Sequence, residues 1–377
     1  MPLHRPYGGT RRSQGRRVTV PGAEREESAR LDDLTTTGTV ASGHTNPADY
    51  VGTTHAGLPV RSGVPGVQID GYFPSDSHTN ANNGWDHDAQ FVIRLPERWN
   101  GGLVVSGAPG VRAQYSNDPA ISDYVLSLGY AYAATDKGNT GLEFYAGSRE
   151  PGDAIVEWNT RMTELAVAAR QTVAQHYGQP ADEVVAAGVS NGGYLVRWQL
   201  ENHPELYTRG VELEGTLWNA DLNPFSALPS AIRGYEQQSP KLITAAGFDP
   251  GSDFLWEYHY TVYWTLTQRI YTRELDPSYQ GSDASYDYSQ RPEAHEAIRR
   301  FGLTGNIGKP LHSIHGTYDC LLPITQSDRY AELARPTGLH TYQRVEAGNH
   351  LDGLVDAHPD RLVPLVPLLQ AAIRTPS

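Results

Sequence analysis

Ser190 lies in a short glycine-rich pattern that is suited to nucleophilic chemistry. The pattern, GVSNG at residues 188–192, matches G-x-S-x-G, with an apolar strand-like run before it and a helical segment after it. A sharp turn between a strand and a helix strains the serine backbone and needs small neighbours, and it raises the hydroxyl above the sheet. We therefore predict that Ser190 is a nucleophile; a purely structural turn is the weaker alternative.

A serine hydroxyl is a weak nucleophile until a base takes its proton and an acid orients that base. After a strand–turn–helix elbow, the order along the chain is serine, acid, histidine. Asp319 directly follows a predicted strand, and His350 follows the last predicted strand through a short loop. These positions predict the triad Ser190, Asp319 and His350. Asp221 is the rival acid, and His315, at a strand end, is expected to be structural.

The negative oxygen that forms when a serine attacks a carbonyl group needs two N–H donors. The N–H of Asn191 lies at the start of the predicted helix and is the first candidate. The second should come from the loop after the first strong strand, here residues 106–110. Pro109 has no N–H, so Ala108 is our first choice and Gly110 the next.

Alternating strands and helices must position these residues. Apolar runs predict buried strands, and spacings of three or four residues between apolar positions predict helices. The strands are expected at 67–73, 90–95, 102–107, 130–135, 183–188, 210–217, 310–316 and 340–348, and the helices at 122–129, 153–177, 191–203, 323–334 and within 362–374. Such alternation predicts an α/β fold with a mostly parallel central sheet and helices on both faces.

The chain divides into four predicted segments. Residues 1–35 mix charged residues and glycine without periodicity and read as a flexible arm; the sheet and its helices occupy 36–217 and 308–377. Residues 218–307 interrupt the alternation with many aromatic residues, which predicts an inserted lid over the serine. Four aromatic side chains of this lid are candidates for lining a substrate pocket: Trp218, Trp256, Tyr260 and Trp264.

Composition narrows the classes of function. The chain has 377 residues, 38% hydrophobic, with a formal net charge of −13, which fits a globular protein and disfavours nucleic acid or anionic membranes as partners. Cys320, the single cysteine, cannot form an intrachain disulfide and is expected to be a small buried residue. The basic N-terminus lacks the apolar stretch of an export signal, so we expect a cytoplasmic protein.

A polar segment at residues 75–88 gathers aspartate, asparagine and histidine. Its spacing does not match a helix–loop–helix calcium site, so a plain surface loop is expected. We predict no metal and no cofactor for this chain.

Several stretches resemble the tannase and feruloyl esterase group of the α/β-hydrolases. They are GYAYAATDKGNTG at 129–141, the run 168–193 through the elbow, HPELYTRGVELEG at 203–215 and the acid segment 309–334; the resemblance covers about 100–217 and 308–353. It implies the same triad of Ser190, Asp319 and His350.

The chain departs from that group at two positions beside the triad. The group has a pair of disulfide-linked cysteines, one before the nucleophile and one before the histidine, where this chain has Val189 and Asn349. The group's calcium-binding lid is also not recognisable. The SNGG elbow is instead similar to that of hydroxybutyrate-oligomer hydrolases, so the resemblance supports the fold and triad more than the substrate.

The sequence therefore predicts a serine hydrolase that cleaves a small-molecule or oligomeric ester, with an aromatic or medium-sized apolar group, through an acyl-enzyme. Two alternatives keep the triad: a hydrolase of hydroxyalkanoate oligomers and a peptidase. A third belongs to another class, namely an inactive hydrolase fold that serves as a binding module.

Overall fold

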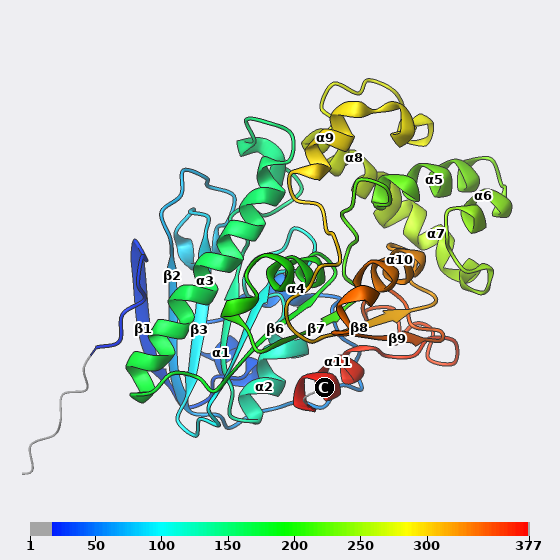
Figure 1. Cartoon of the computed structure of the whole chain (residues 1–377). Coiled ribbons are helices and arrows are strands. Elements are labelled where there is room, and N and C mark those ends of the chain that lie inside the picture. Colours follow the sequence, from blue (N-terminus) through cyan, green and yellow to red (C-terminus); the bar gives the residue numbers. More distant parts are fainter. Residues whose placement is uncertain (1–16, 376–377) are drawn as a thin grey trace, which may run out of the picture.

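A single mixed β-sheet organises the chain (Figure 1). The computed structural model describes residues 17–375, and within them the nine-stranded sheet has the order β1-β2-β3-β5-β4-β6-β7-β8-β9. β3 pairs antiparallel with β5, and all pairs from β5 to β9 are parallel. The strands are β1 (Arg25–Leu31), β2 (Gly66–Tyr72), β3 (Gln90–Pro96), β4 (Gly102–Gly107), β5 (Ala131–Thr135), β6 (Glu183–Val189), β7 (Arg209–Leu213), β8 (Leu311–Gly316) and β9 (His340–Val345).

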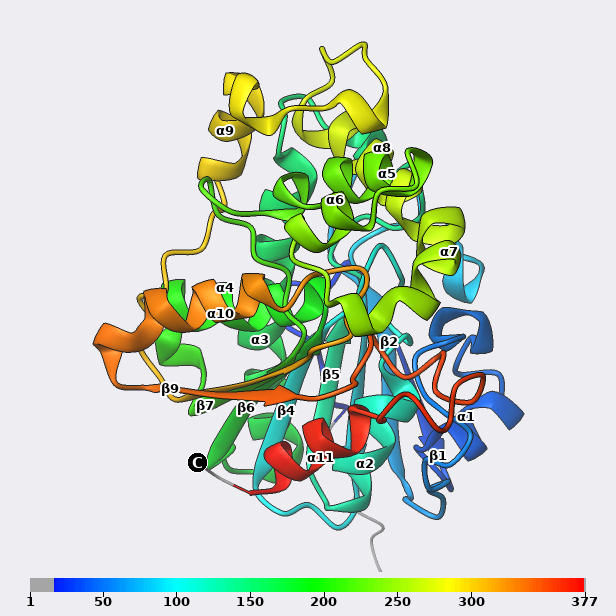
Figure 2. The ribbon, with the colours of Figure 1, turned by 90° about the vertical axis from the view of Figure 1, so that its right-hand side faces the viewer.

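Helices cover both faces of the sheet, as the continuous apolar strands require (Figure 2). One face carries α3 (Asp153–Tyr177), α4 (Asn191–Asn202) and α10 (Thr325–Ala334); the other carries α2 (Asp123–Ser127) and α11 (Val366–Arg374). Successive residues of β4 show the division. Leu103 and Val105 belong to the apolar core under α3 and α4, whereas Val104 belongs to the core under α2 and α11. The predicted α/β architecture is confirmed.

The N-terminal part of the chain differs from the prediction of a flexible arm over residues 1–35. Residues 1–16 lie outside the described residues, but Arg25–Leu31 forms β1, which pairs antiparallel with β2, Arg25 opposite Tyr72. α1 (Thr36–Ala41) follows it. The arm prediction was therefore wrong for this strand. Its charged, largely exposed side chains suit an edge strand, where they discourage pairing with other chains. Because they do not alternate with apolar residues, the sequence shows no strand pattern here.

The segment between β7 and β8 forms a helical cap above the carboxyl ends of the parallel strands (Figures 1 and 2). It contains α5 (Leu228–Glu236), α6 (Pro240–Ala245), α7 (Trp256–His259), α8 (Thr265–Leu275) and α9 (Pro292–Arg299). Much of the cap has an apolar core of its own, in which Ile232, Leu255 and Trp264 are buried. The cap thus folds around its own aromatic residues while it lies over the edge where the loops of the sheet converge.

The polar segment at residues 75–88 is more than the expected surface loop. Asp88 and Asn80 are buried, and Asp88 accepts hydrogen bonds from the backbone N–H and the hydroxyl of Thr79. Asn80 Nδ2 donates to the buried Asp136. The segment is therefore fastened against the ends of β3 and β5. No helix in residues 17–375 has the length and apolar content needed to cross a bilayer.

Candidate active site

The turn between β6 and α4 holds Ser190 in an unusual backbone conformation, with φ 59° and ψ −119°. The backbone N–H of Ser190 donates to Leu213 O of the neighbouring β7, which fixes the turn to the sheet. The flanking glycines are sterically required: a Cβ on Gly188 would lie 2.3 Å from Gly192 O, and one on Gly192 would lie 2.5 Å from Gly107 O. The strained turn predicted from the G-x-S-x-G pattern is present.

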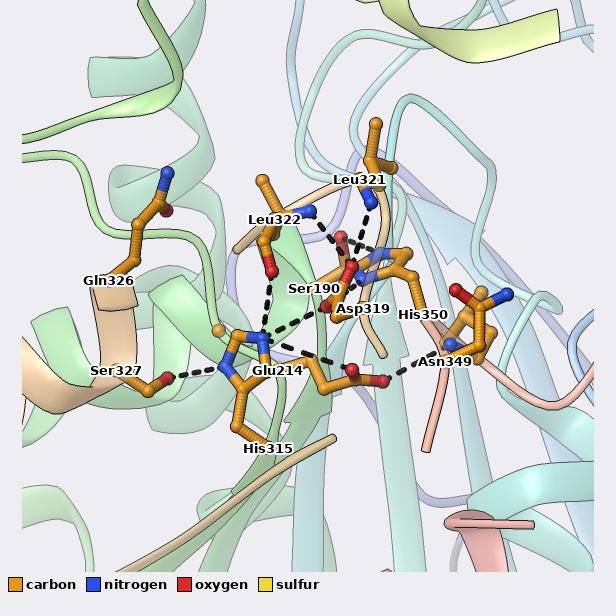
Figure 3. Close-up of polar contacts among 12 residues, drawn as sticks. Ser190, Glu214, His315, Asp319, Leu321, Leu322, Gln326, Ser327, Asn349 and His350 are labelled. Carbon is orange, nitrogen blue, oxygen red and sulfur yellow. Dashed lines mark hydrogen bonds and ion pairs between the residues drawn. The ribbon is translucent and has the colours of Figure 1, made fainter. Parts of the chain in front are cut away.

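A continuous chain of hydrogen bonds joins Ser190 to His350 and Asp319 (Figure 3). His350 Nε2 lies 3.0 Å from Ser190 Oγ, and His350 Nδ1 lies 2.8 Å from Asp319 Oδ2. Because a carboxylate can only accept, Nδ1 carries the ring proton and Nε2 is left to accept from the serine hydroxyl. The structure thus brings the three predicted residues together in the order that a serine nucleophile needs. Asp221, the rival acid, is exposed.

Asp319 is held as an anion although it is buried. Burial alone would raise the pKa of Asp319, but His350 and His315 bring that pKa well below its usual range through charge and hydrogen bonding. Its Oδ1 also accepts from the backbone N–H groups of Leu321 and Leu322, at 2.9 and 2.8 Å. A carboxylate with this many donors stays charged and fixes the ring of His350.

His315, expected to be structural, touches the acid directly. Its Nε2 lies 3.0 Å from Asp319 Oδ2 and 2.9 Å from Leu322 O, so Nε2 carries a proton toward both acceptors. On the other side of the ring, Nδ1 accepts from the hydroxyl of Ser327 at 2.6 Å. The same hydroxyl oxygen accepts from Arg197. His315 therefore anchors Asp319 to α10 and α4 (Figure 3). The only sequence signal for it is its place four residues before Asp319.

Glu214, which sequence reasoning missed, adds a second buried carboxyl to the site. It follows β7 with φ 53°, and its Oε1 accepts from the N–H of Leu351, next to His350. Burial and the neighbouring Asp319 raise the pKa of Glu214 well above its usual range. Glu214 is therefore the protonated member of the pair, while Asp319 carries the charge.

The predicted pair of oxyanion donors is half supported by the structure. Asn191 is the first residue of α4, where a backbone N–H has no acceptor within the helix. Ala108, our first choice for the second donor, was wrong, because its N–H extends the sheet by donating to Thr135 O at 3.2 Å. Gly110, the second choice, borders the space in front of Ser190 with φ 54°. The Asn191 side chain holds this loop, since its Nδ2 donates to Gly110 O at 3.1 Å.

Two cavities meet at Ser190. The first, which we call the aromatic cavity, measures about 190 Å³ and is lined mainly by Trp218, Tyr271, Ile270 and Leu266. The second, the polar cavity, measures about 150 Å³, and its lining includes His350, His259, Tyr258, Asn349 and Leu354. Ser190, Gly110, Arg112, Tyr263 and Leu321 border both. Ser190 thus borders both cavities.

Only one of the four predicted lid aromatics borders these cavities. Trp218 lines the aromatic cavity. Trp264 is buried in the core of the cap, where its Nε1 donates to Cys320 O, and Trp256 lies in the same core. Tyr260 stacks on Tyr235 at 4.2 Å between ring centroids. The last three were wrong as pocket residues because they hold the cap together.

Two other aromatic residues of the insertion, Tyr271 and Tyr263, reach the site and are not among the four predicted pocket residues. Tyr271 of α8 packs against Trp218 at 5.1 Å between ring centroids, and its hydroxyl accepts from Asn191 Nδ2 at 2.6 Å. Tyr263 borders both cavities. Asn191 therefore ties the nucleophile turn to the cap as well as to the loop at Gly110. Nothing in the spacing of the aromatic residues distinguishes these from the packing residues.

Glu214, Asp319 and His350 are the residue types that bind metals, with ligand atoms all within 4.8 Å of one another. Their contacts, however, are those of a proton-holding set: Asp319 accepts from His350 and two backbone N–H groups, and Glu214 accepts from Leu351. Both carboxylate oxygens of Asp319 and both ring nitrogens of His350 have hydrogen-bond partners, whereas Glu214 Oε2 has none among the described residues. The donor set fits hydrogen-bond chemistry better than metal binding.

Comparisons with known proteins agree with the fold. Residues 120–226, which include Ser190, match the prolyl oligopeptidase family, and no curated protein matches the chain in sequence. The structure is similar to feruloyl esterase B from Aspergillus oryzae, with a TM-score of 0.59 and 11% identity over 87% of this chain and 80% of that one. It is also similar to an esterase from Aspergillus oryzae, with a TM-score of 0.60 and 13% identity over 95% of this chain and 87% of that one. A third similar structure is tannin acyl hydrolase from Aspergillus niger, with a TM-score of 0.52 and 12% identity over 86% of this chain and 78% of that one.

The two positions that depart from the tannase and feruloyl esterase pattern make separate contacts here. Val189 is buried in the core under α2 and α11. Asn349 is buried, and its Oδ1 accepts from the N–H of Cys320 at 3.3 Å. A hydrogen bond thus joins the histidine loop to the acid loop in this chain. Cys320 is buried, as expected.

Proposed function

The chain has the α/β-hydrolase fold, and we propose that it is a serine hydrolase that cleaves a carboxylic ester through an acyl-enzyme. The observation that carries the proposal is the unbroken hydrogen-bond chain from Ser190 through His350 to Asp319 on the strained turn after β6. A binding module has no use for such a chain, and the strain of the turn would be a cost without a benefit.

In the proposed reaction, His350 Nε2 takes the proton of Ser190 as Oγ attacks the carbonyl carbon. Asp319 holds the ring and stabilises the charged imidazole that results. The N–H groups of Asn191 and Gly110 face the oxygen that becomes negative. His350 then gives the proton to the leaving alcohol, and a water activated by the same nitrogen releases the acid from Ser190.

The aromatic cavity supports a substrate with one apolar group of about the size of an aromatic ring. Its volume is about 190 Å³, and an apolar protein cavity of about 150 Å³ holds benzene. Trp218, Tyr271 and Ile270 would surround such a group with apolar surface and ring edges. An aryl or medium-sized apolar ester is therefore the proposed substrate class.

A peptidase is the second candidate, because residues 120–226 match the prolyl oligopeptidase family. The triad serves both reactions, so the leaving group decides between them. The distinguishing experiment measures kcat/KM for phenyl-containing esters and for amides of the same shape, with the wild-type chain and with Ser190→Ala. Preferential turnover of the amides would refute the esterase proposal.

The same experiment tests the mechanism. We expect ester hydrolysis by the wild type and a loss of roughly 10⁶-fold in kcat for Ser190→Ala, as expected when the nucleophile of a triad is removed. A Ser190→Ala chain that is folded and still hydrolyses the esters at the wild-type rate would refute the role of Ser190.

A further inference from the structure

Arg112 stands where the two cavities meet the nucleophile. It lines both the polar and the aromatic cavity, together with Ser190. No carboxylate lines either cavity in the part of the chain that the structure describes, and Arg112 is their one lysine or arginine. His259 stays neutral there, because burial lowers its pKa to about 4. Arg112 therefore supplies the permanent positive charge of the space in front of Ser190.

The other arginines inside the molecule show how this chain normally treats a buried cation. Arg94 pairs with Asp118 at 2.7 Å and Arg197 with Glu212 at 2.7 Å, and all four side chains are fully buried. This is the general rule, since a charge removed from water is costly unless it has an opposite charge beside it. Arg112 differs from both: it is half-buried, and it forms no ion pair within residues 17–375, in a protein with a net charge of −13.

Arg112 has only backbone partners, which occupy one part of its guanidinium group. Its Nη1 donates to the carbonyl oxygens of Asp49 and Val51, at 3.1 and 2.7 Å. Within residues 17–375 no ion pair or further side-chain hydrogen bond engages its Nε or Nη2. Burial lowers the pKa of Arg112, with only partial compensation from Tyr263 and Asp49. The group is thus held in place and partly desolvated, and no described residue forms an ion pair with it.

The carboxylate of Asp49 attracts Arg112 only at longer range and forms no ion pair with it. This carboxylate accepts from Asn82 Nδ2 at 2.9 Å, and burial raises its pKa to about 6. The contact between the two residues is the hydrogen bond that Arg112 Nη1 donates to the backbone carbonyl oxygen of Asp49. The remaining N–H groups of Arg112 are of the kind that bind a carboxylate with two parallel hydrogen bonds.

We propose that Arg112 binds a carboxylate of the substrate in the polar cavity, while an apolar ring occupies the aromatic cavity. This inference rests on the proposed esterase function and narrows it: the substrate is an ester that joins a ring-sized apolar group to a short group bearing a free carboxylate. Tyr258 and Tyr263 also line the polar cavity. Arg112 is then a specificity-determining residue.

The test compares esters that differ only in charge. One pair is carboxymethyl phenylacetate and its neutral carbamoylmethyl analogue, with the charge on the alcohol side. The other is monobenzyl glutarate and its neutral glutaramate analogue, with the charge on the acyl side. We expect the wild type to prefer the carboxylate of at least one pair by tenfold or more in kcat/KM, since one desolvated charge pair is worth at least this much.

Substitution of Arg112 then assigns the preference. In Arg112→Met the ratio of anionic to neutral kcat/KM should fall to about one or below, and Arg112→Lys should retain part of it. Arg329→Met, which removes an exposed arginine of α10 that borders neither cavity, should keep the wild-type ratio. The ratio is decisive, because loss of the hydrogen bonds to Asp49 and Val51 alone would slow both members of a pair equally.

Three outcomes overturn the inference. A wild type without preference for either carboxylate refutes it while the esterase function stands. An Arg112→Met chain that labels normally with a fluorophosphonate and keeps the full preference refutes the role of Arg112. Hydrolysis of no ester by the wild type would refute the proposed function, and the inference with it.

Discussion

The two sides of Ser190 are built in opposite ways. Behind the serine, His350, Asp319, His315 and Glu214 form a buried polar cluster in which nearly every atom has a fixed partner. In front of it, loops of the sheet and residues of the cap together line two cavities, one of them lined mainly by apolar side chains. Under the proposed function, the polar cluster serves a single proton pathway, whereas the cavities select the substrate by its shape and charge.

This difference predicts two kinds of mutant. Changes in the polar cluster should lower kcat for every substrate, because the reacting bond is the same in all of them. Changes in the cavities should alter kcat/KM selectively, according to the group that each substrate places there. Asp319→Asn, Trp218→Leu and Glu214→Gln test this division.

Asp319→Asn should have the largest effect among them. The amide can donate a hydrogen bond to His350 Nδ1, which favours the ring form with its proton on Nε2, where it cannot accept from Ser190. We expect kcat to fall by about 10⁴-fold for all esters while KM changes little. Steady-state kinetics with a phenylacetate ester and an acetate ester check this. A loss confined to one of the two would contradict the division between the two sides.

Trp218→Leu should act on only one class of substrate. The change enlarges the aromatic cavity and removes the ring that packs on Tyr271. We expect kcat/KM for a phenyl-containing ester to fall by roughly 10- to 100-fold, the range that partial loss of a buried ring contact supplies, with a smaller change for an acetate ester. Tyr260→Leu is the matched control, since Tyr260 is a cap aromatic that borders neither cavity. Equal losses in both variants would show that the cap acts only through its stability.

Glu214→Gln should have the smallest effect on activity. Glutamine has the shape of the protonated acid, and its oxygen can still accept from Leu351, so kcat should stay within about tenfold of the wild type. Glu214→Leu removes that acceptor beside His350 and should cost more. If Glu214→Gln were as inactive as Asp319→Asn, Glu214 would carry the charge instead.

The pH dependence of stability gives Glu214→Gln a second readout. A carboxyl whose pKa is raised on folding keeps its proton in the folded state and loses it in the unfolded state above a pKa of about 4.3. Its contribution to stability is therefore complete below that pH and declines as the pH rises. Urea unfolding at pH 5 and pH 8 should show Glu214→Gln gaining stability relative to the wild type at the higher pH. A constant difference would contradict the protonated state of Glu214.

How far the sequence predicts the site follows the same division. Ser190, Asp319 and His350 were predictable because each follows a strand, and strand ends of a parallel sheet meet at one edge. Ala108 was wrong because the end of β4 could not be located to within one residue, and its N–H still belongs to the sheet. Glu214 and His315 carry no motif; only the packing of β7 and β8 side by side brings them to Asp319.

The cap was less predictable for a physical reason. An aromatic side chain can fill a core or line a pocket, and both uses look alike in sequence. Trp264 and Trp218 are both fully buried, yet the first holds the cap and the second faces a cavity beside Ser190. Whether an aromatic residue packs in the cap core or lines a cavity depends on how α8 lies over the sheet, and no local sequence pattern predicts that placement. Strand β1 was missed for a similar reason, because its partner β2 determines its conformation.

The most direct test of the central claim is covalent labelling with a fluorophosphonate, followed by peptide mapping. An activated serine reacts with this reagent, and an ordinary serine hydroxyl does not. We predict a single label on Ser190 in the wild type, much slower labelling in Asp319→Asn and none at this position in Ser190→Ala. A folded wild-type chain that hydrolyses esters while Ser190 stays unlabelled, or while another residue takes the label, would contradict the account.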